Sequence, residues 1–77
     1  MIKIYSTPTC SYCLVAKRYF REKRIKFTEY NVAVDERRAA EMKHKSRQQG
    51  VPVIDIHGKI IVGFDKTKIN RELNRRK

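Results

Sequence analysis

The apolar residues of this chain alternate between the spacing of a strand and the spacing of a helix, and this alternation limits the fold most strongly. Short β-branched runs predict strands over residues 2–5, 25–31, 53–56 and 60–62. Helical spacing predicts helices over residues 11–23, 35–47 and 65–75. The order βαβαββα predicts an α/β fold with a mixed four-stranded sheet flanked by helices.

The expected first helix and last two strands carry the clearest local signals. Apolar or aromatic side chains recur along the helix and are expected to form its buried stripe: Tyr12, Val15, Ala16, Tyr19 and Phe20. The tripeptide 57–59 separates the last two strands, and Gly58 within it can adopt a positive φ. We therefore expect an antiparallel hairpin, placed at the edge of the sheet.

Size and composition limit the class of protein. A chain of 77 residues with 40% hydrophobic residues is expected to form one domain, residues 1–77, and not a disordered segment. No apolar run approaches the ~18 residues of a membrane span. The chain begins with Met1-Ile2-Lys3, without a charged leader or an apolar targeting segment. We expect no membrane partner and a cytoplasmic location.

The charge balance is strongly basic, with 19 Lys and Arg against 8 Asp and Glu, a formal net charge of +11. Such a charge attracts acidic partners and opposes self-association, so we expect a monomer. The basic residues are spread along all three expected helices, and no groove-binding motif accompanies them. Nucleic acid is therefore the less favoured partner, and a basic nucleic-acid-binding module remains an alternative of another functional class.

The only two cysteines, Cys10 and Cys13, lie three positions apart where the first strand gives way to the first helix. A helix N-terminus stabilises a negative thiolate, so Cys10 is the expected nucleophile. Cys13 is expected to be more buried, with a higher pKa, and to act as the resolving thiol. A zinc site would need two further ligands, and His44 and His57 lack the usual spacing, so no metal is expected. An incidental buried pair of cysteines is the other alternative.

Two further segments are candidates for substrate binding. If the Val51–Pro52 bond is cis, the backbone of Val51 can pair with an extended thiol substrate like an added strand; the sequence leaves the isomer open. Gly63 permits an unusual turn, and the N–H groups of Phe64 and Asp65 are expected to begin the last helix as an anion site. A plain strand-to-helix turn capped by Asp65 is the alternative.

Taken together, these motifs resemble those of glutaredoxins over essentially the whole chain, and most closely those of the short prokaryotic glutaredoxin-like proteins. The motifs are residues 7–13, 50–52 and 62–65, in the family's order and spacing. The resemblance implies a thioredoxin-like fold, a cis proline at Pro52 and thiol–disulfide exchange through Cys10. It also implies glutathione as reductant, with no bound cofactor, and a set of glutathione-binding residues: Tyr12, Val51, Pro52, Gly63, Phe64 and Asp65.

The chain departs from the usual glutaredoxin pattern at several positions. Thr7 stands where many glutaredoxins have Lys, and Lys66 replaces one of two acidic residues. Residues 47–49 offer polar groups that can still bind a carboxylate. An alternative is a redoxin that takes electrons from thioredoxin reductase and passes them to ribonucleotide reductase. The Trp-containing signature usual in those redoxins is absent from this chain.

Overall fold

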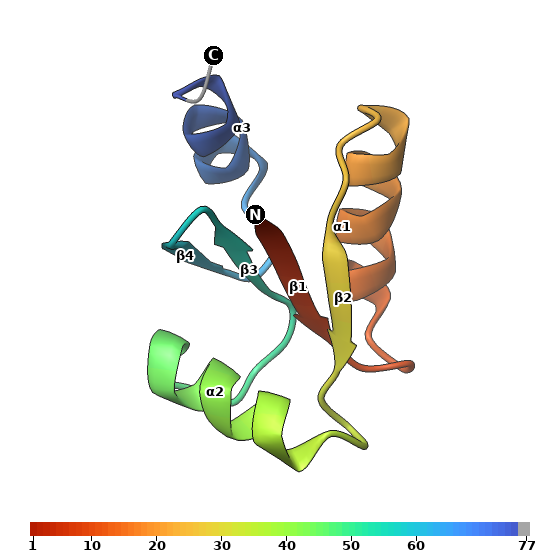
Figure 1. The fold of residues 1–77 in the computed structure, drawn as a ribbon. Coiled ribbons are helices and arrows are strands. Elements are labelled where there is room, and N and C mark those ends of the chain that lie inside the picture. The colour runs from red at the N-terminus through yellow and green to blue at the C-terminus, as the bar shows by residue number, and fades with distance from the viewer. Residues whose placement is uncertain (76–77) are drawn as a thin grey trace.

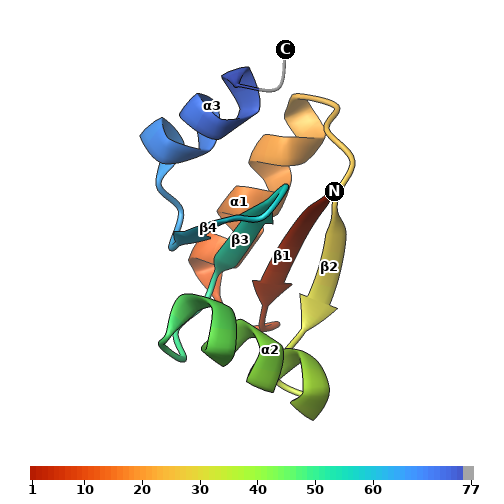
Figure 2. The ribbon, with the colours of Figure 1, turned by 60° about the vertical axis from the view of Figure 1, so that its left-hand side comes forward.

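The computed structural model describes residues 1–75 and consists of one four-stranded sheet and three helices (Figures 1 and 2). The elements are β1 (Ile2–Ser6), α1 (Ser11–Glu22), β2 (Thr28–Asn31), α2 (Glu36–Ser46), β3 (Val53–Ile56), β4 (Lys59–Val62) and α3 (Lys66–Asn74). The predicted order βαβαββα and the predicted mixed sheet are confirmed. Residues 76 and 77, the end of the expected domain, lie outside the described part.

The strands are arranged in the order β2-β1-β3-β4. β1 pairs in parallel with β2 and antiparallel with β3, and β3 pairs antiparallel with β4. The β3–β4 hairpin therefore lies at one edge of the sheet, as predicted. Its turn places both His57 (φ 51°) and Gly58 (φ 98°) at positive φ, as a two-residue turn of type I′ requires.

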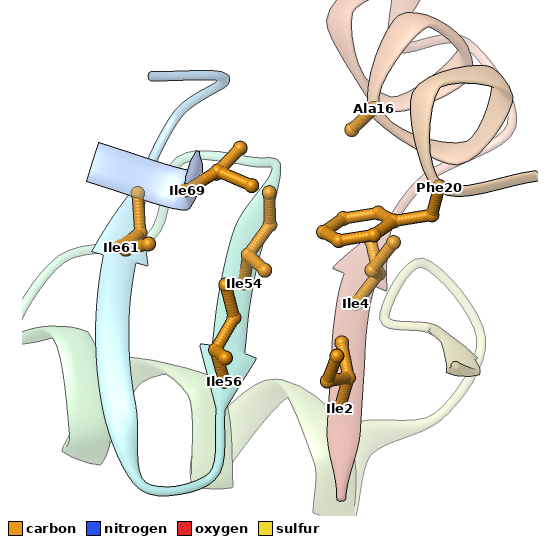
Figure 3. Close-up of a cluster of buried hydrophobic side chains, with 8 residues drawn as sticks. All are labelled: Ile2, Ile4, Ala16, Phe20, Ile54, Ile56, Ile61 and Ile69. Atoms are coloured by element: carbon orange, nitrogen blue, oxygen red, sulfur yellow. The ribbon is translucent and has the colours of Figure 1, made fainter. Parts of the chain in front are cut away.

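The two faces of the sheet are covered by different helices. On one face, Ala16 and Phe20 of α1 and Ile69 of α3 pack against isoleucines of β1, β3 and β4 (Figure 3). On the other face, Met42 of α2 packs with Tyr5 and Val53. α2 lies at the end of the sheet where β1 and β2 finish (Figures 1 and 2). Apolar side chains thus cover both faces of the sheet, and α2 lies with the loops at the end where β1 and β2 finish (Figure 1).

Several predicted boundaries differ from the structure. β2 begins at Thr28 and not at residue 25, because its pairing with β1 starts at Lys3 and Thr28. Ile25 and Phe27 nevertheless pack against the first core from the preceding segment. β1 runs one residue further than predicted, and β4 begins one residue earlier, at Lys59.

The predicted apolar stripe of α1 is partly wrong. Tyr12 is 65% exposed and Val15 is 41% exposed, whereas Cys13 is fully buried. The residues that face the sheet are Cys13, Ala16 and Phe20, at spacings of three and four along the helix. Tyr12 precedes Cys13 by one residue, which rotates its side chain by about 100° away from this face.

Tyr5 belongs to a polar cluster that joins the sheet to α2. Its hydroxyl donates to Glu41, and Lys45 Nζ donates to the Tyr5 hydroxyl at 3.3 Å and to Asp55 at 2.9 Å. Burial raises the pKa of Tyr5 to about 12. The hydrogen bond from Tyr5 holds the pKa of Glu41 below its ordinary value of 4.5, and Asp55 raises the pKa of Lys45. The cluster therefore stabilises the fold while Glu41 is ionised.

We predict that truncating Phe20 to alanine lowers the free energy of unfolding by about 3–5 kcal/mol, because the fully buried ring leaves a cavity. Urea denaturation monitored by circular dichroism measures this loss. Val34→Ala removes an apolar side chain that is 80% exposed and should change stability by less than about 0.5 kcal/mol. Equal losses in the two variants would contradict the packing described above.

We also predict an acid-dependent loss of stability that involves Glu41. Its pKa is lowered in the folded state, so its contribution is present above pH 4.5 and disappears as the pH falls through the folded value. Urea denaturation at a series of pH values should show a shallower decline below pH 4.5 for Glu41→Gln than for the wild type. The control Glu22→Gln changes an exposed carboxylate on α1. If Glu41→Gln and wild type declined in parallel, the cluster would have no such role.

Candidate active site at the end of the sheet

The strand register brings the three motifs together at one end of the sheet. β1 finishes at Ser6 and leads through residues 7–9 to Cys10. β3 runs antiparallel to β1, with Tyr5 opposite Val53, so the preceding Pro52 lies beside the end of β1. Val62, the last residue of β4, pairs with Val53, and the Gly63 N–H donates to the Pro52 carbonyl at 2.8 Å. Segments far apart in the sequence therefore surround the Cys10 loop.

Cys10 is the N-cap residue of α1. Its backbone is extended (φ −86°, ψ 111°), and its Sγ accepts a hydrogen bond from the Cys13 N–H at 3.1 Å. Its own N–H donates to the Thr7 carbonyl at 3.3 Å, which fixes the loop before it. The half-buried sulfur thus lies against unpaired N–H groups at the positive end of the helix dipole, where a negative charge is favoured. The predicted placement of Cys10 at a helix N-terminus is confirmed.

Cys13 lies one turn further along α1 and is fully buried. Burial, with a smaller effect of the neighbouring Cys10 thiol, raises the pKa of its thiol to about 12. The Thr7 backbone and the positive charge of Lys17 act in the opposite direction. Both cysteines are free thiols in this structure. The pair therefore consists of one accessible sulfur and one shielded sulfur.

A polar group that the sequence analysis missed lies beside Cys13. Lys17 Nζ is 2.6 Å from Glu29 Oε2, and the buried Ser6 hydroxyl donates to the same oxygen at 2.8 Å. Lys17 holds the pKa of Glu29 below its ordinary value. The position of Lys17, four residues after Cys13 on the same helix, is a signal that could have pointed to it.

The Val51–Pro52 peptide bond is cis, and Pro52 is buried. Within residues 1–75, no hydrogen bond of the protein uses the backbone N–H or C=O of Val51. The segment before it is fixed by Gln48, whose side-chain amide accepts from the Gly50 N–H at 2.6 Å and donates to the Gly50 carbonyl at 3.0 Å. The backbone of Val51 is therefore free to pair with a ligand.

A groove of about 380 Å³ lies between the Thr7 loop and α2. Its lining is mainly apolar, with Lys43 as its cation: Thr7, Val32, Ala39, Ala40, Met42, Lys43, Gln49 and Val51. Residues 47–49 were expected to offer polar groups that bind a carboxylate, and of these only Gln49 lines this groove. Arg47 ends α2 in the left-handed conformation (φ 60°). The groove shares Val51 with the cis-proline segment.

The turn after β4 differs from the expectation. Gly63 has a positive φ of 80°, but α3 begins at Lys66, and the Asp65 carboxylate caps it by accepting from the Lys68 N–H at 3.1 Å. The N–H groups of Phe64 and Asp65 therefore precede the helix instead of beginning it, and their use as an anion site stays a prediction. The Phe64 ring packs edge-on against Tyr19, with the ring centroids 5.6 Å apart. Tyr12, by contrast, projects from the first turn of α1 beside Cys10 and is exposed.

Two further features concern metals and membranes. Within residues 1–75, no group of three or more His, Cys, Asp or Glu side chains is placed to hold a metal ion. None of the helices in this part of the chain has the length and apolar character needed to cross a bilayer.

Comparison with known proteins agrees with this geometry. The glutaredoxin family model matches residues 2–61. A glutaredoxin-like 8.6 kDa protein from the rubredoxin operon of Clostridium pasteurianum is 54% identical over 71 residues, covering 92% of this chain and 95% of that protein.

Solved structures share the fold. The thioredoxin-like protein BC3987 has a TM-score of 0.88 at 21% identity, with 94% of this chain and 99% of that chain covered. The glutaredoxin-like NrdH-redoxin of Escherichia coli, described as having a thioredoxin-like activity profile, has a TM-score of 0.78 at 28% identity, with 91% of each chain covered. From its thioredoxin-like fold and its sequence, this chain belongs to the glutaredoxin family.

Proposed function

We propose that this protein is a thiol–disulfide oxidoreductase that reduces protein disulfides and glutathione mixed disulfides through Cys10 and Cys13. The observation that carries the proposal is the hydrogen bond from the Cys13 N–H to Cys10 Sγ, at 3.1 Å, next to a fully buried second thiol. One sulfur is accessible at a helix N-terminus, where a negative charge is favoured, and the other is held within one helical turn of it. Membership of the glutaredoxin family supports the same chemistry.

The proposed reaction has two exchange steps. The Cys10 thiolate attacks a substrate disulfide, forms a mixed disulfide and releases one substrate thiolate, which takes a proton from water. The Cys13 sulfur then attacks Cys10 Sγ, the Cys10–Cys13 disulfide forms, and the second substrate thiol leaves. The substrate disulfide has gained two electrons. Two molecules of glutathione return the enzyme to the dithiol and become glutathione disulfide.

The same end of the sheet supplies contacts for the substrate. The unpaired backbone of Val51, next to Pro52, suits an extended peptide or the cysteinyl backbone of glutathione. Tyr12 offers an exposed ring beside Cys10, and the groove with Lys43 offers apolar walls and a cation. Gly63 borders the site through its hydrogen bond to the Pro52 carbonyl, and Phe64 and Asp65 follow it along the chain. We propose these residues as the glutathione contacts, with Asp65 acting from its capping position.

The roles of the two cysteines predict different losses on substitution. Cys10→Ser should abolish reduction of both protein disulfides and glutathionylated peptides, because no nucleophile remains. Cys13→Ser should lose protein disulfide reduction but keep deglutathionylation, since glutathione can resolve the mixed disulfide. Coupled assays with NADPH, glutathione reductase and each substrate measure these activities. Disulfide reductase activity retained by Cys10→Ser would overturn the assignment.

A second candidate keeps the chemistry and changes the electron donor. Similarity to NrdH-redoxin favours a redoxin reduced by thioredoxin reductase that donates electrons to ribonucleotide reductase. Thr7 and Lys66, which replace a lysine and an acidic residue typical of glutaredoxins, also favour weaker use of glutathione. We favour glutathione because the backbone of Val51 and the cation of the neighbouring groove remain available.

The choice of donor is decided by two coupled assays on the same protein substrate. We predict turnover with glutathione, glutathione reductase and NADPH, and little turnover with thioredoxin reductase and NADPH. The Cys10→Ser protein serves as the blank in both assays. Efficient turnover with thioredoxin reductase alone would reverse the order of the two candidates.

The proposed setting of this activity is the cytoplasm, with the protein acting as a monomer. A net charge of +11 favours disulfide-bearing substrates with acidic surfaces over other proteins. A nucleic-acid-binding role has weaker support, because the basic residues are distributed over three helices and no motif accompanies them.

A further inference from the structure

The resolving step requires a negative charge on the Cys13 sulfur, which lies in the protein interior where a charge is unfavourable. Only the thiolate form of Cys13 attacks a disulfide, yet its sulfur is fully buried. Burial is the largest cause that raises its pKa to about 12. The protein therefore needs a feature that favours the negative sulfur at this position, separate from the helix terminus that serves Cys10.

Lys17 is the side chain placed to do this. It follows Cys13 by four residues on α1, a spacing that puts two side chains on the same helical face, about 5–6 Å apart at Cβ. Only 12% of its side chain is exposed, and its ammonium is 2.6 Å from Glu29 Oε2. The buried Ser6 hydroxyl holds the same carboxylate oxygen at 2.8 Å. Ser6 extends the face of β1 that carries Ile2 and Ile4, against which α1 packs.

We propose that Lys17, held in place by Glu29 and Ser6, is a positioning residue that favours the Cys13 thiolate during resolution of the mixed disulfide. This inference rests on the proposed function, because it assumes that Cys13 resolves a disulfide formed on Cys10. It adds a residue that acts on the second step and leaves the first step to the N-terminus of α1.

The charge of Lys17 matters most after Cys10 has captured a substrate. In the free dithiol, the Cys10 sulfur adds to the effects that disfavour a negative Cys13. In the mixed disulfide, Cys10 carries no charge. The Thr7 backbone still favours the Cys13 anion, and Lys17 is the charged side chain that adds to this effect. Cys13 then gives its proton to water, its sulfur bonds to Cys10 Sγ, and the substrate sulfur leaves and takes up a proton. The net change is one thiol exchanged for another.

Glu29 holds the Lys17 ammonium in place and does not accept the proton of Cys13. Lys17 and the Ser6 hydroxyl both hold the pKa of its carboxyl low, so it is a weak base. Arg21, on the same helix, also acts on this carboxyl in the same direction. Cys10 and Lys17 thus act on the charge of Cys13, and Lys17 and Arg21 act on the charge of Glu29.

Reaction with dithiobis(nitrobenzoic acid) separates the two steps in one stopped-flow trace. Attack by Cys10 releases one thionitrobenzoate, and attack by Cys13 on the resulting mixed disulfide releases a second one. We expect Lys17→Met to slow the second release about tenfold near neutral pH, because the variant lacks one partly screened positive charge near the Cys13 thiolate. The first release should keep its rate. The pH profile of the second release should move to higher pH.

Control variants separate the charge from a structural effect. Lys17→Arg keeps the cation and should restore the second release, whereas Lys26→Met removes an exposed lysine and should leave both releases unchanged. Lys17→Gln serves if Lys17→Met fails to fold in a urea titration. An unchanged rate and pH profile of the second release in a folded, neutral Lys17 variant would overturn the inference. Absence of the first release from the wild type would instead overturn the proposed function.

Discussion

The hydrogen bond from the Cys13 N–H to Cys10 Sγ is the interaction on which the proposed chemistry depends. Most helices place an oxygen of Ser, Thr, Asp or Asn at the N-cap position, and α2 and α3 follow this rule with Asp35 and Asp65. In α1 the cap is a sulfur. The same backbone geometry that begins the helix therefore also presents a reactive group, and a negative charge on that group is favoured by the helix it caps.

The rest of the fold serves to hold other segments around that sulfur. Antiparallel pairing of β1 with β3 and of β3 with β4 brings Pro52 and Gly63 to the end of the sheet where β1 delivers the Cys10 loop. Apolar side chains on both faces fix this sheet against α1 and α3 on one side and α2 on the other. α2 in turn forms a wall of the groove next to Val51. Two small cores thus position a site made from three loops and the N-terminus of α1.

Periodicity and turn chemistry in the sequence predicted the order of elements, the hairpin at Gly58 and the helix-terminal position of Cys10. These features depend on neighbours along the chain. The start of β2 was not predictable, because it depends on where β1 offers a partner strand. The exposure of Tyr12 follows from the orientation of α1 on the sheet, which no local pattern sets. The contact between Lys17 and Glu29 joins a helix to a strand, so it required the tertiary structure.

The most direct test of the central claim is the order in which the two thiols react. Native protein is treated with iodoacetamide for increasing times over a range of pH, and the modified cysteines are identified by mass spectrometry. We expect Cys10 to be alkylated near neutral pH faster than the cysteine of an unstructured peptide with the same flanking residues, while Cys13 stays unmodified until the protein is unfolded. Reaction of both cysteines at the rate of that peptide would contradict the account.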